Sequence, residues 1–414
     1  MPASSTPGIA AYRALPRRAG WGYLFAAGFG RLPLSMVPLA VLTLATSASG
    51  SIAVGGFAAA AAAIGEAVGA PASGALADRF GQRTVLLVGV VLHVSLLVTL
   101  TIGAGSFPDA ATVALAGLVG LSLPQVGAFS RSRWLVIAPD DVPAAFAFEG
   151  VMDEIAYIFG PALVGIVAAF VSPQAATLLA GALVAVFATQ FAVHPSHRRV
   201  PRASQREVEP PTPARNRTLI VVALGGMLAM GIFFGASQTG LTAVAEAAGI
   251  PDAGALLYAV MAVGSAATTL SMVLVPERIG TWTRWSTAAV GMAAGATLML
   301  LAPGLVWVVI AALLAGAFQG PLLLTIFRVV GDAAPGRRAG ILLTLTTSGI
   351  VLGIALGSAV SGALAESFGA VGGLAPVLGA TLLLLAIGLT GAARSRLSRA
   401  GGRSGERDLA VEHE

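Results

Sequence analysis

The chain has 414 residues, of which 56% are hydrophobic and only 10% are charged, and its formal net charge is +5. Soluble proteins carry roughly a quarter charged residues, so this chain lacks the polar surface that a water-soluble fold needs. The absence of cysteine excludes disulfides, thiolate metal sites and cysteine nucleophiles.

Long apolar runs follow one another along the chain and are separated by short turns. A helix needs about 20 apolar residues to cross a bilayer core, and these runs are too long and too little alternating for the strands of a barrel. The sequence therefore predicts an all-α membrane protein with twelve transmembrane helices, near residues 22–46, 52–77, 83–103, 110–130, 144–171, 175–193, 218–240, 253–275, 285–303, 305–329, 339–364 and 372–393.

The arginines predict the orientation in the membrane. Turns after the odd-numbered helices contain none, whereas both termini and the connection after residue 193 are rich in arginine. The even-numbered turns carry Arg79, Arg83, Arg131, Arg133, Arg278, Arg284, Arg337 and Arg338. Because positively charged loops stay in the cytoplasm, we expect both termini there, with the chain in the plasma or inner membrane. This use of the positive charge gives no indication of nucleic-acid binding.

The same pattern divides the chain into five predicted parts. The segment 194–217 is polar, charged and rich in proline, which is typical of a flexible linker. The composition of the C-terminal tail predicts disorder. The parts are a cytoplasmic N-terminus (1–21), a six-helix bundle (22–193), the cytoplasmic linker (194–217), a second six-helix bundle (218–393) and the tail (394–414).

Matching features recur in the two bundles at a nearly constant spacing. The pairs are Asp78 and Glu277, Pro124 and Pro321, Gly160 and Gly357, and Gly165 and Gly362. Because six helices is an even number, the bundles are expected to be parallel repeats about an axis along the membrane normal. Such an arrangement places a substrate site at their interface near mid-membrane.

The turn after the second predicted helix reads Gly74-Ala-Leu-Ala-Asp78-Arg79-Phe-Gly81-Gln-Arg83. It resembles the loop between helices 2 and 3 of transporters of the major facilitator superfamily. A degenerate copy with Glu277 and Arg278 follows helix 8, so the resemblance covers essentially the whole chain. It implies that the Asp78 carboxylate lies at the N-terminal end of helix 11 and latches the bundles on the cytoplasmic side. The alternative is a turn that fixes topology without gating.

In the fifth helix, Gly160, Pro161 and Gly165 resemble a signature of the antiporter branches, which include proton-coupled exporters of drugs and metabolites. Val164 stands where that pattern has the first of two glycines. The resemblance favours antiport, and a packed helix bend without a specific role is the alternative. The fourth helix lacks the membrane-embedded arginine that such exporters often carry early in it.

Ionisable residues within the predicted helices are the main functional candidates, because charge inside a membrane is costly. Arg31 lies about nine residues into helix 1, roughly 14 Å at 1.5 Å per residue, and therefore near mid-depth. It needs a counter-charge, and an acid of helix 5 or helix 2 is the natural one. The acids are Glu66, Glu149, Asp153 and Glu154, and Tyr157 shares a helix face with Glu149 and Asp153.

A carboxylate beside an arginine stays ionised, whereas a desolvated one without a partner can carry a proton. One of these acids is thus expected to be structural and another a proton carrier, unless all of them are packing ion pairs. Polar contacts to a substrate could come from Gln125, Gln238, Tyr258 and Gln319. The C-terminal bundle has no acid or base deep in a helix and is expected to offer a mostly apolar wall.

No nucleotide-binding loop, metal-ligand cluster or activated nucleophile is recognisable, so the sequence predicts neither an enzyme nor a cofactor or metal. The leading hypothesis is a secondary active transporter that works by alternating access and exports a small, partly apolar compound against inward proton flow. One alternative is an importer or facilitator of a sugar or organic acid, in which Arg31 binds a carboxylate or phosphate. Another is a non-transporting sensor or scaffold. The expected partners are the small-molecule substrate, protons and membrane lipids, and the expected state is a monomer.

Overall fold

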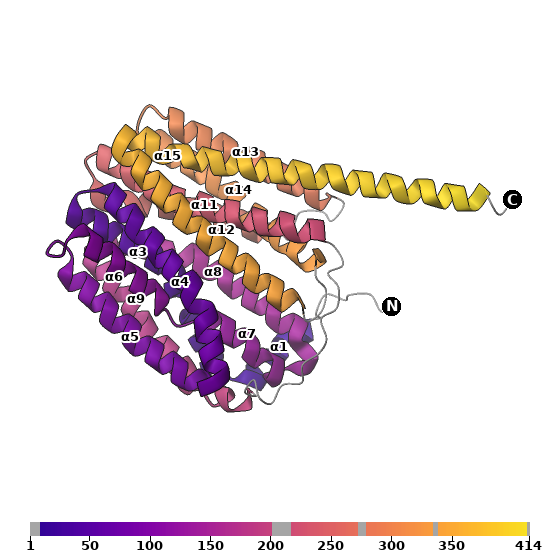
Figure 1. Ribbon diagram of the computed structural model, residues 1–414, viewed down its shortest axis with the longest axis horizontal. Coiled ribbons are helices and arrows are strands. Elements are labelled where there is room, and N and C mark those ends of the chain that lie inside the picture. The colour runs from indigo at the N-terminus through magenta and orange to yellow at the C-terminus, as the bar shows by residue number, and fades with distance from the viewer. Residues whose placement is uncertain (1–8, 201–216, 272–278, 334–337, 412–414) are drawn as a thin grey trace.

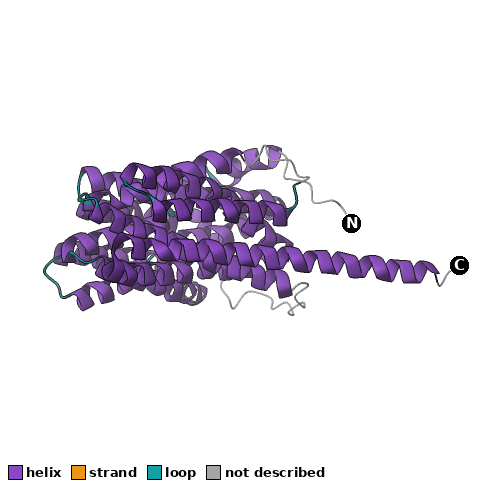
Figure 2. Cartoon of the chain, turned by 90° about the horizontal axis from the view of Figure 1, so that it is seen from above, coloured by secondary structure: helices purple, strands orange, loops and turns teal. Residues whose placement is uncertain are grey.

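The computed structural model describes residues 9–200, 217–271, 279–333 and 338–411, and this part of the chain is helical without strands (Figure 2). The α-helices are α1 (Ile9–Ala19), α2 (Trp21–Phe29), α3 (Leu32–Ser49), α4 (Ile52–Phe80), α5 (Gln82–Gly103), α6 (Asp109–Leu121), α7 (Val126–Ile137), α8 (Val142–Phe170), α9 (Pro173–Leu183), α10 (Thr189–Val193), α11 (Arg217–Ala247), α12 (Gly254–Ser271), α13 (Thr281–Leu301), α14 (Leu305–Ala333) and α15 (Arg338–Val411). A π-helical turn, Val184–Ala188, joins α9 to α10.

The predicted all-α membrane fold is confirmed. Nine helical stretches in the described residues are long and apolar enough to cross a membrane. One of them, Ser348–Arg394, is broken at Gly369, which has a φ of 67°, a value that glycine adopts readily. This stretch therefore supplies two crossings. With α12 and α13, these stretches follow the order of the twelve predicted segments.

The two halves of the chain lie side by side, and both termini emerge at one end of the bundle (Figure 1). We name this end the termini end and the opposite one the far end. The N-terminal half comprises α2 to α10 and the C-terminal half α11 to α15. Contact between the halves is made mainly by α4 against α15 and by α8 against α12.

The first predicted crossing is interrupted in its middle. Helix α2 ends at Phe29 and α3 begins at Leu32, with Gly30 and Arg31 between them. Pro33 at the start of α3 has no N–H to continue the hydrogen bonds of α2, which accounts for the interruption. The break leaves carbonyl groups of α2 without a backbone donor, and the Arg31 side chain donates a hydrogen bond to one of them.

The predicted end of the fourth crossing is wrong. The sequence placed it near residue 130, but after an interruption around Pro124 the helix continues as α7 to Ile137. Arg131 and Arg133, which were expected in a turn, therefore lie inside a helix. Arg133 is fully buried, and its guanidinium stacks 3.8 Å from the centre of the Phe191 ring. Packing against neighbouring helices thus accommodates a charge that composition alone assigns to the loop.

The C-terminal tail also differs from the expected disorder. Helix α15 continues to Val411 and extends beyond the bundle at the termini end (Figure 1). The tail 394–414 contains no proline, and its most frequent residue is arginine, which is a good helix former. A helix can therefore propagate from the last membrane crossing into this segment.

Candidate functional site

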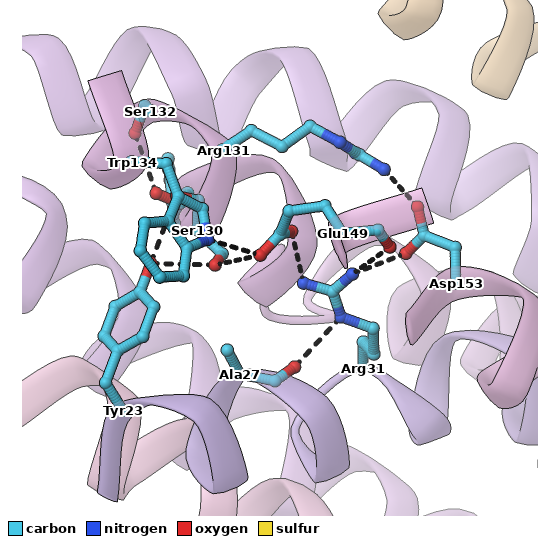
Figure 3. Close-up of polar contacts among 10 residues, drawn as sticks. Tyr23, Ala27, Arg31, Ser130, Arg131, Ser132, Trp134, Glu149 and Asp153 are labelled. Atoms are coloured by element: carbon cyan, nitrogen blue, oxygen red, sulfur yellow. Dashed lines mark hydrogen bonds and ion pairs between the residues drawn. The ribbon is translucent and has the colours of Figure 1, made fainter. Parts of the chain in front are cut away.

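Arg31 is the centre of a buried charge cluster in the N-terminal half (Figure 3). Its Nη2 donates to Glu149 Oε2 at 2.5 Å, and its Nη1 donates to Asp153 Oδ1 at 2.8 Å. The guanidinium also donates from Nε to the Ala27 carbonyl at 2.9 Å and from Nη1 to the Glu149 carbonyl at 3.1 Å. The expected counter-charge of Arg31 is thus found on α8, the fifth predicted crossing, and both acids of one face supply it.

Glu149 is fully buried, and its second carboxylate oxygen is also satisfied. Oε1 accepts from Ser130 Oγ at 2.7 Å and from Trp134 Nε1 at 2.8 Å. Because the Ser130 hydroxyl donates to Glu149, the Tyr23 hydroxyl is the donor in its 2.8 Å contact with Ser130 Oγ. Both carboxylate oxygens of Glu149 are therefore bonded, and the residue links α8 to α7 and to Arg31.

Asp153 lies nearer the surface of the same cluster, with 21% of its side chain exposed. Its Oδ1 binds Arg31, and its Oδ2 pairs with Nη2 of Arg131 from α7. The cluster thus contains two arginines and two carboxylates and is neutral overall. Each arginine that could otherwise attract an anion is already paired.

A cavity of about 290 Å³ lies beside the cluster, between the two halves. Arg31, Arg131 and Asp153 line it on one side, and Leu323 and Phe327 of α14 line it on the other. It extends from Glu66, midway along α4, to Gly74 near the end of that helix. We call it the main cavity, and it lies toward the termini end.

Glu66 differs from the other two acids. Its side chain is 5% exposed, and within the described part of the chain no hydrogen bond or ion pair reaches its carboxyl group. It is close enough to Tyr157 for the two groups to interact electrostatically. Glu66 is therefore an uncompensated carboxyl group at the boundary between the halves.

A second, much smaller cavity of about 10 Å³ adjoins the main cavity. Glu66 and Tyr157 line both cavities, while Gln238 and Tyr258 of the C-terminal half line the small one. Tyr157 stacks on Phe234 across the boundary, with ring centroids 6.1 Å apart and planes inclined by 17°. We call this space the small cavity.

The remaining polar candidates have different surroundings. Gln125 lines the main cavity and donates to the Leu123 carbonyl at 3.2 Å. Gln319 is 8% exposed and lies in α14, but it lines neither cavity. The side chain of Glu154 lies outside what the structure describes, as do Glu277 and Arg278. Among the described residues, no group of three or more histidine, aspartate or glutamate side chains could hold a metal ion.

The loop after α4 lies at the termini end. Gly81 adopts a φ of 88°, which favours glycine and allows the sharp turn into α5. Asp78, Gly81 and Arg83 line a depression of about 670 Å³ together with Gly74 and Arg198. The Arg79 guanidinium lies 5.2 Å from the centre of the Phe80 ring. A latch between Asp78 and the start of α15, the eleventh predicted crossing, stays a prediction, because the side chains there lie outside the described residues.

The signature glycines mark close helix contacts. A Cβ on Gly160 would meet Ser35 of the same half, and one on Gly357 would meet the Ile232 carbonyl of its own half. By contrast, a Cβ on Gly165 would meet the Ala255 backbone of the other half. Pro161 follows Gly160 and lines the small cavity.

Four residues of the cluster were not foreseen as site residues: Tyr23, Ser130, Arg131 and Trp134. Arg131 was assigned to a turn because the apolar run of its helix ends at residue 130. The others are ordinary helix residues whose role emerges only when three helices meet. The one sequence signal that could have identified them is a polar residue on the same helix face as an ionisable residue that is expected to be buried.

Comparison with known proteins supports the same architecture. Residues 22–340 match the sequence model of the Major Facilitator Superfamily. No curated protein sequence matches the chain. Among solved structures, a D-xylose-proton symporter is similar with a TM-score of 0.65 at 17% identity, over 90% of this chain and 97% of that one.

Two further structures have the same fold. A mutant of the nucleoside transporter NupG has a TM-score of 0.64 at 14% identity, over 89% of this chain and 96% of that one. A bacterial homologue of the iron transporter ferroportin in an inward-facing state has a TM-score of 0.59 at 17% identity, over 92% and 100% of the two chains. The expectation of a secondary transporter rather than an enzyme is confirmed, and the chain belongs to the Major Facilitator Superfamily.

Proposed function

We propose that the protein exchanges protons for a small, partly apolar compound, and that Glu66 carries the proton. The observation that supports this assignment is the difference between Glu66 and the other buried acids. Glu149 and Asp153 are each held by an arginine, whereas Glu66 has no partner among the described side chains and lines both cavities. A carboxyl group in this position can gain and lose a proton without breaking a structural ion pair.

The volume and lining of the main cavity favour a small cargo. Its volume of about 290 Å³ is at the lower limit of typical small-molecule sites. Its wall combines apolar side chains, such as Leu34, Leu323 and Phe327, with the polar edge of the charge cluster. This combination favours a compound with an apolar body and few polar groups.

The proposed direction is export. It rests on the arginine distribution, which assigns the termini end to the cytoplasm, and on the resemblance of α8, the fifth predicted crossing, to antiporters. The halves touch at the far end through Gly56 and Gly362, and the main cavity lies on the other side of this contact. With that orientation, the conformation is the inward-facing one, ready to take up cargo from the cytoplasm.

The importer of an organic acid is less well supported. That hypothesis requires Arg31 to bind a carboxylate or phosphate of the substrate. Arg31 instead donates to Ala27, Glu149 and Asp153, so an anionic substrate would have to displace a buried carboxylate. Displacement of this kind leaves an uncompensated buried charge.

The proposal can be tested in inside-out vesicles with a pH-gradient dye and a panel of antibiotics, amines, sugars and organic acids. We expect one compound class to release a preformed proton gradient, and Glu66→Gln to abolish this release. Asp109→Asn is the matched control, because Asp109 is an exposed acid at the far end. Exchange of labelled for unlabelled cargo should persist in Glu66→Gln at saturating cargo, since it needs no net proton movement and the amide oxygen of glutamine can still accept a hydrogen bond. Unchanged proton release in Glu66→Gln would overturn the proposal.

A further inference from the structure

The small cavity joins groups from both halves of the chain. Glu66 and Tyr157 come from α4 and α8, and Phe234, Gln238 and Tyr258 come from α11 and α12. A volume of about 10 Å³ accommodates a single group of the size of a water molecule. The small cavity therefore restricts which part of a cargo can enter, whereas the main cavity next to it is large enough for an apolar body.

Gln238 lines this space and carries an unused hydrogen-bonding atom. The residue is 4% exposed and lies close to the Tyr258 hydroxyl, and its Oε1 is buried without a partner. A buried acceptor that lacks a donor is unfavourable, and polar ligands commonly satisfy such atoms. Glu66 offers a second unused acceptor in the same cavity.

The charges around both cavities restrict the ligand further. Among the described side chains that line them, the cations are Arg31 and Arg131, and both are paired with carboxylates. The remaining charged group is the Glu66 carboxyl. The rings of Tyr157, Phe234 and Tyr258 add aromatic surface, which favours a cation over an anion.

We propose that the small cavity binds the primary ammonium group of the cargo and that Gln238 determines this specificity. The ammonium group donates to the Glu66 carboxylate and to Gln238 Oε1, and the apolar body lies in the main cavity. A primary ammonium has the size of the cavity and three donors, whereas a trimethylammonium group is larger and has none. This inference rests on the proposed function, since Glu66 serves both the proton and the cargo.

The test is equilibrium binding to the purified, full-length protein by calorimetry. The probes share one apolar body and differ in the head group: 2-phenylethylamine, its N,N,N-trimethyl derivative, 2-phenylethanol and 3-phenylpropanoate. We expect the primary amine to bind at least about tenfold more tightly than each of the others, because a site built to receive hydrogen-bond donors rejects analogues that lack them. Equal binding of the trimethyl derivative, or no binding of the amine, would overturn the proposal.

Two variants separate specificity from folding. Gln238→Leu should weaken binding of 2-phenylethylamine by about tenfold, the loss typical of one hydrogen bond to a charged group. Gln319→Leu makes the same chemical change at another buried glutamine whose Oε1 also lacks a partner, but which lines neither cavity. Its amine binding should be unchanged. Equal losses in both variants would overturn the assignment of Gln238.

The same measurements distinguish this inference from the proposed function. Proton exchange that depends on Glu66 but is driven only by compounds without an amine would overturn the ammonium site and leave proton coupling intact. Tight amine binding that depends on Gln238, without proton release in vesicles, would support the ammonium site and contradict proton coupling.

Discussion

Gly56 of α4 and Gly362 of α15 meet at the boundary between the halves: a Cβ on Gly362 would lie 3.2 Å from the Gly56 Cα. Gly165 makes the equivalent contact on the other side, against the Ala255 backbone. Gly165 and Gly362 are also one of the repeated pairs in the sequence. The two halves thus use the same position of their repeat to close the far end.

Adding a methyl group at these contacts should open the far end. In Gly56→Ala and Gly165→Ala, the new Cβ would clash with backbone of the opposite half and disfavour the observed conformation by about 1–3 kcal/mol. The expected change in population is about 5- to 150-fold. Labelling of a single cysteine at Ser51 by a membrane-impermeant maleimide measures it, and the rate should rise.

Gly160→Ala and Gly357→Ala are matched controls, because their new Cβ atoms would contact residues of the same half. They should lower stability without raising the labelling rate. Faster labelling in these controls would mean that the effect comes from general loosening rather than from the contact between halves.

A cross-link at the far end should stop transport. Glu366 Oε2 of α15 accepts from Ser51 Oγ at 3.1 Å and from the Ala53 backbone N–H at 3.4 Å, at the start of α4. The natural chain has no cysteine, so Ser51→Cys with Glu366→Cys introduces one defined pair. Joining the two with a short bis-thiosulfonate reagent should abolish cargo flux, and reduction should restore it. Full flux in the cross-linked protein would contradict alternating access through this end.

Removal of the buried acid Glu149 should destabilise the fold more than removal of Asp153. Glu149→Gln leaves the Arg31 guanidinium with less charge compensation in a fully buried site, at a cost of about 3–5 kcal/mol. Asp153→Asn should cost less, because Arg31 keeps Glu149 and the Asp153 side chain is 21% exposed. Thermal unfolding in detergent compares the two variants.

The double variant Arg31→Met with Glu149→Gln tests the cause of that loss. It removes both charges, while the amide oxygen of glutamine can still accept from Ser130 and Trp134. Most of the lost stability should therefore return. A double variant no more stable than Glu149→Gln would show that the ion pair is not the cause.

Several features were predictable from the sequence because they depend on local patterns. The length of the apolar runs predicted the membrane helices. The depth of Arg31 predicted an acidic partner on the fifth or the second predicted crossing, which are α8 and α4. The spacing of Glu149 and Asp153 placed both on one helix face, where the structure finds them.

Other features depend on contacts between helices that no local pattern contains. The sequence could not separate the paired acids from the unpaired one, because this requires knowing that Arg31 faces α8 and not Glu66. It also placed Arg131 and Arg133 in a turn. The stacking of Arg133 on Phe191 and its hydrogen bonds to Gln82 and the Phe191 carbonyl keep it inside the protein.

In the proposed mechanism, Glu66 takes up and releases the transported proton. Infrared difference spectroscopy of the reconstituted protein, recorded as the bath pH is stepped, observes the C=O band of a protonated carboxyl group directly. We predict one band that changes with pH and with cargo, that is absent in Glu66→Gln, and that remains in Asp153→Asn and Asp109→Asn. A band that persists in Glu66→Gln and disappears in Asp153→Asn would contradict this role of Glu66 and assign the proton to the charge cluster.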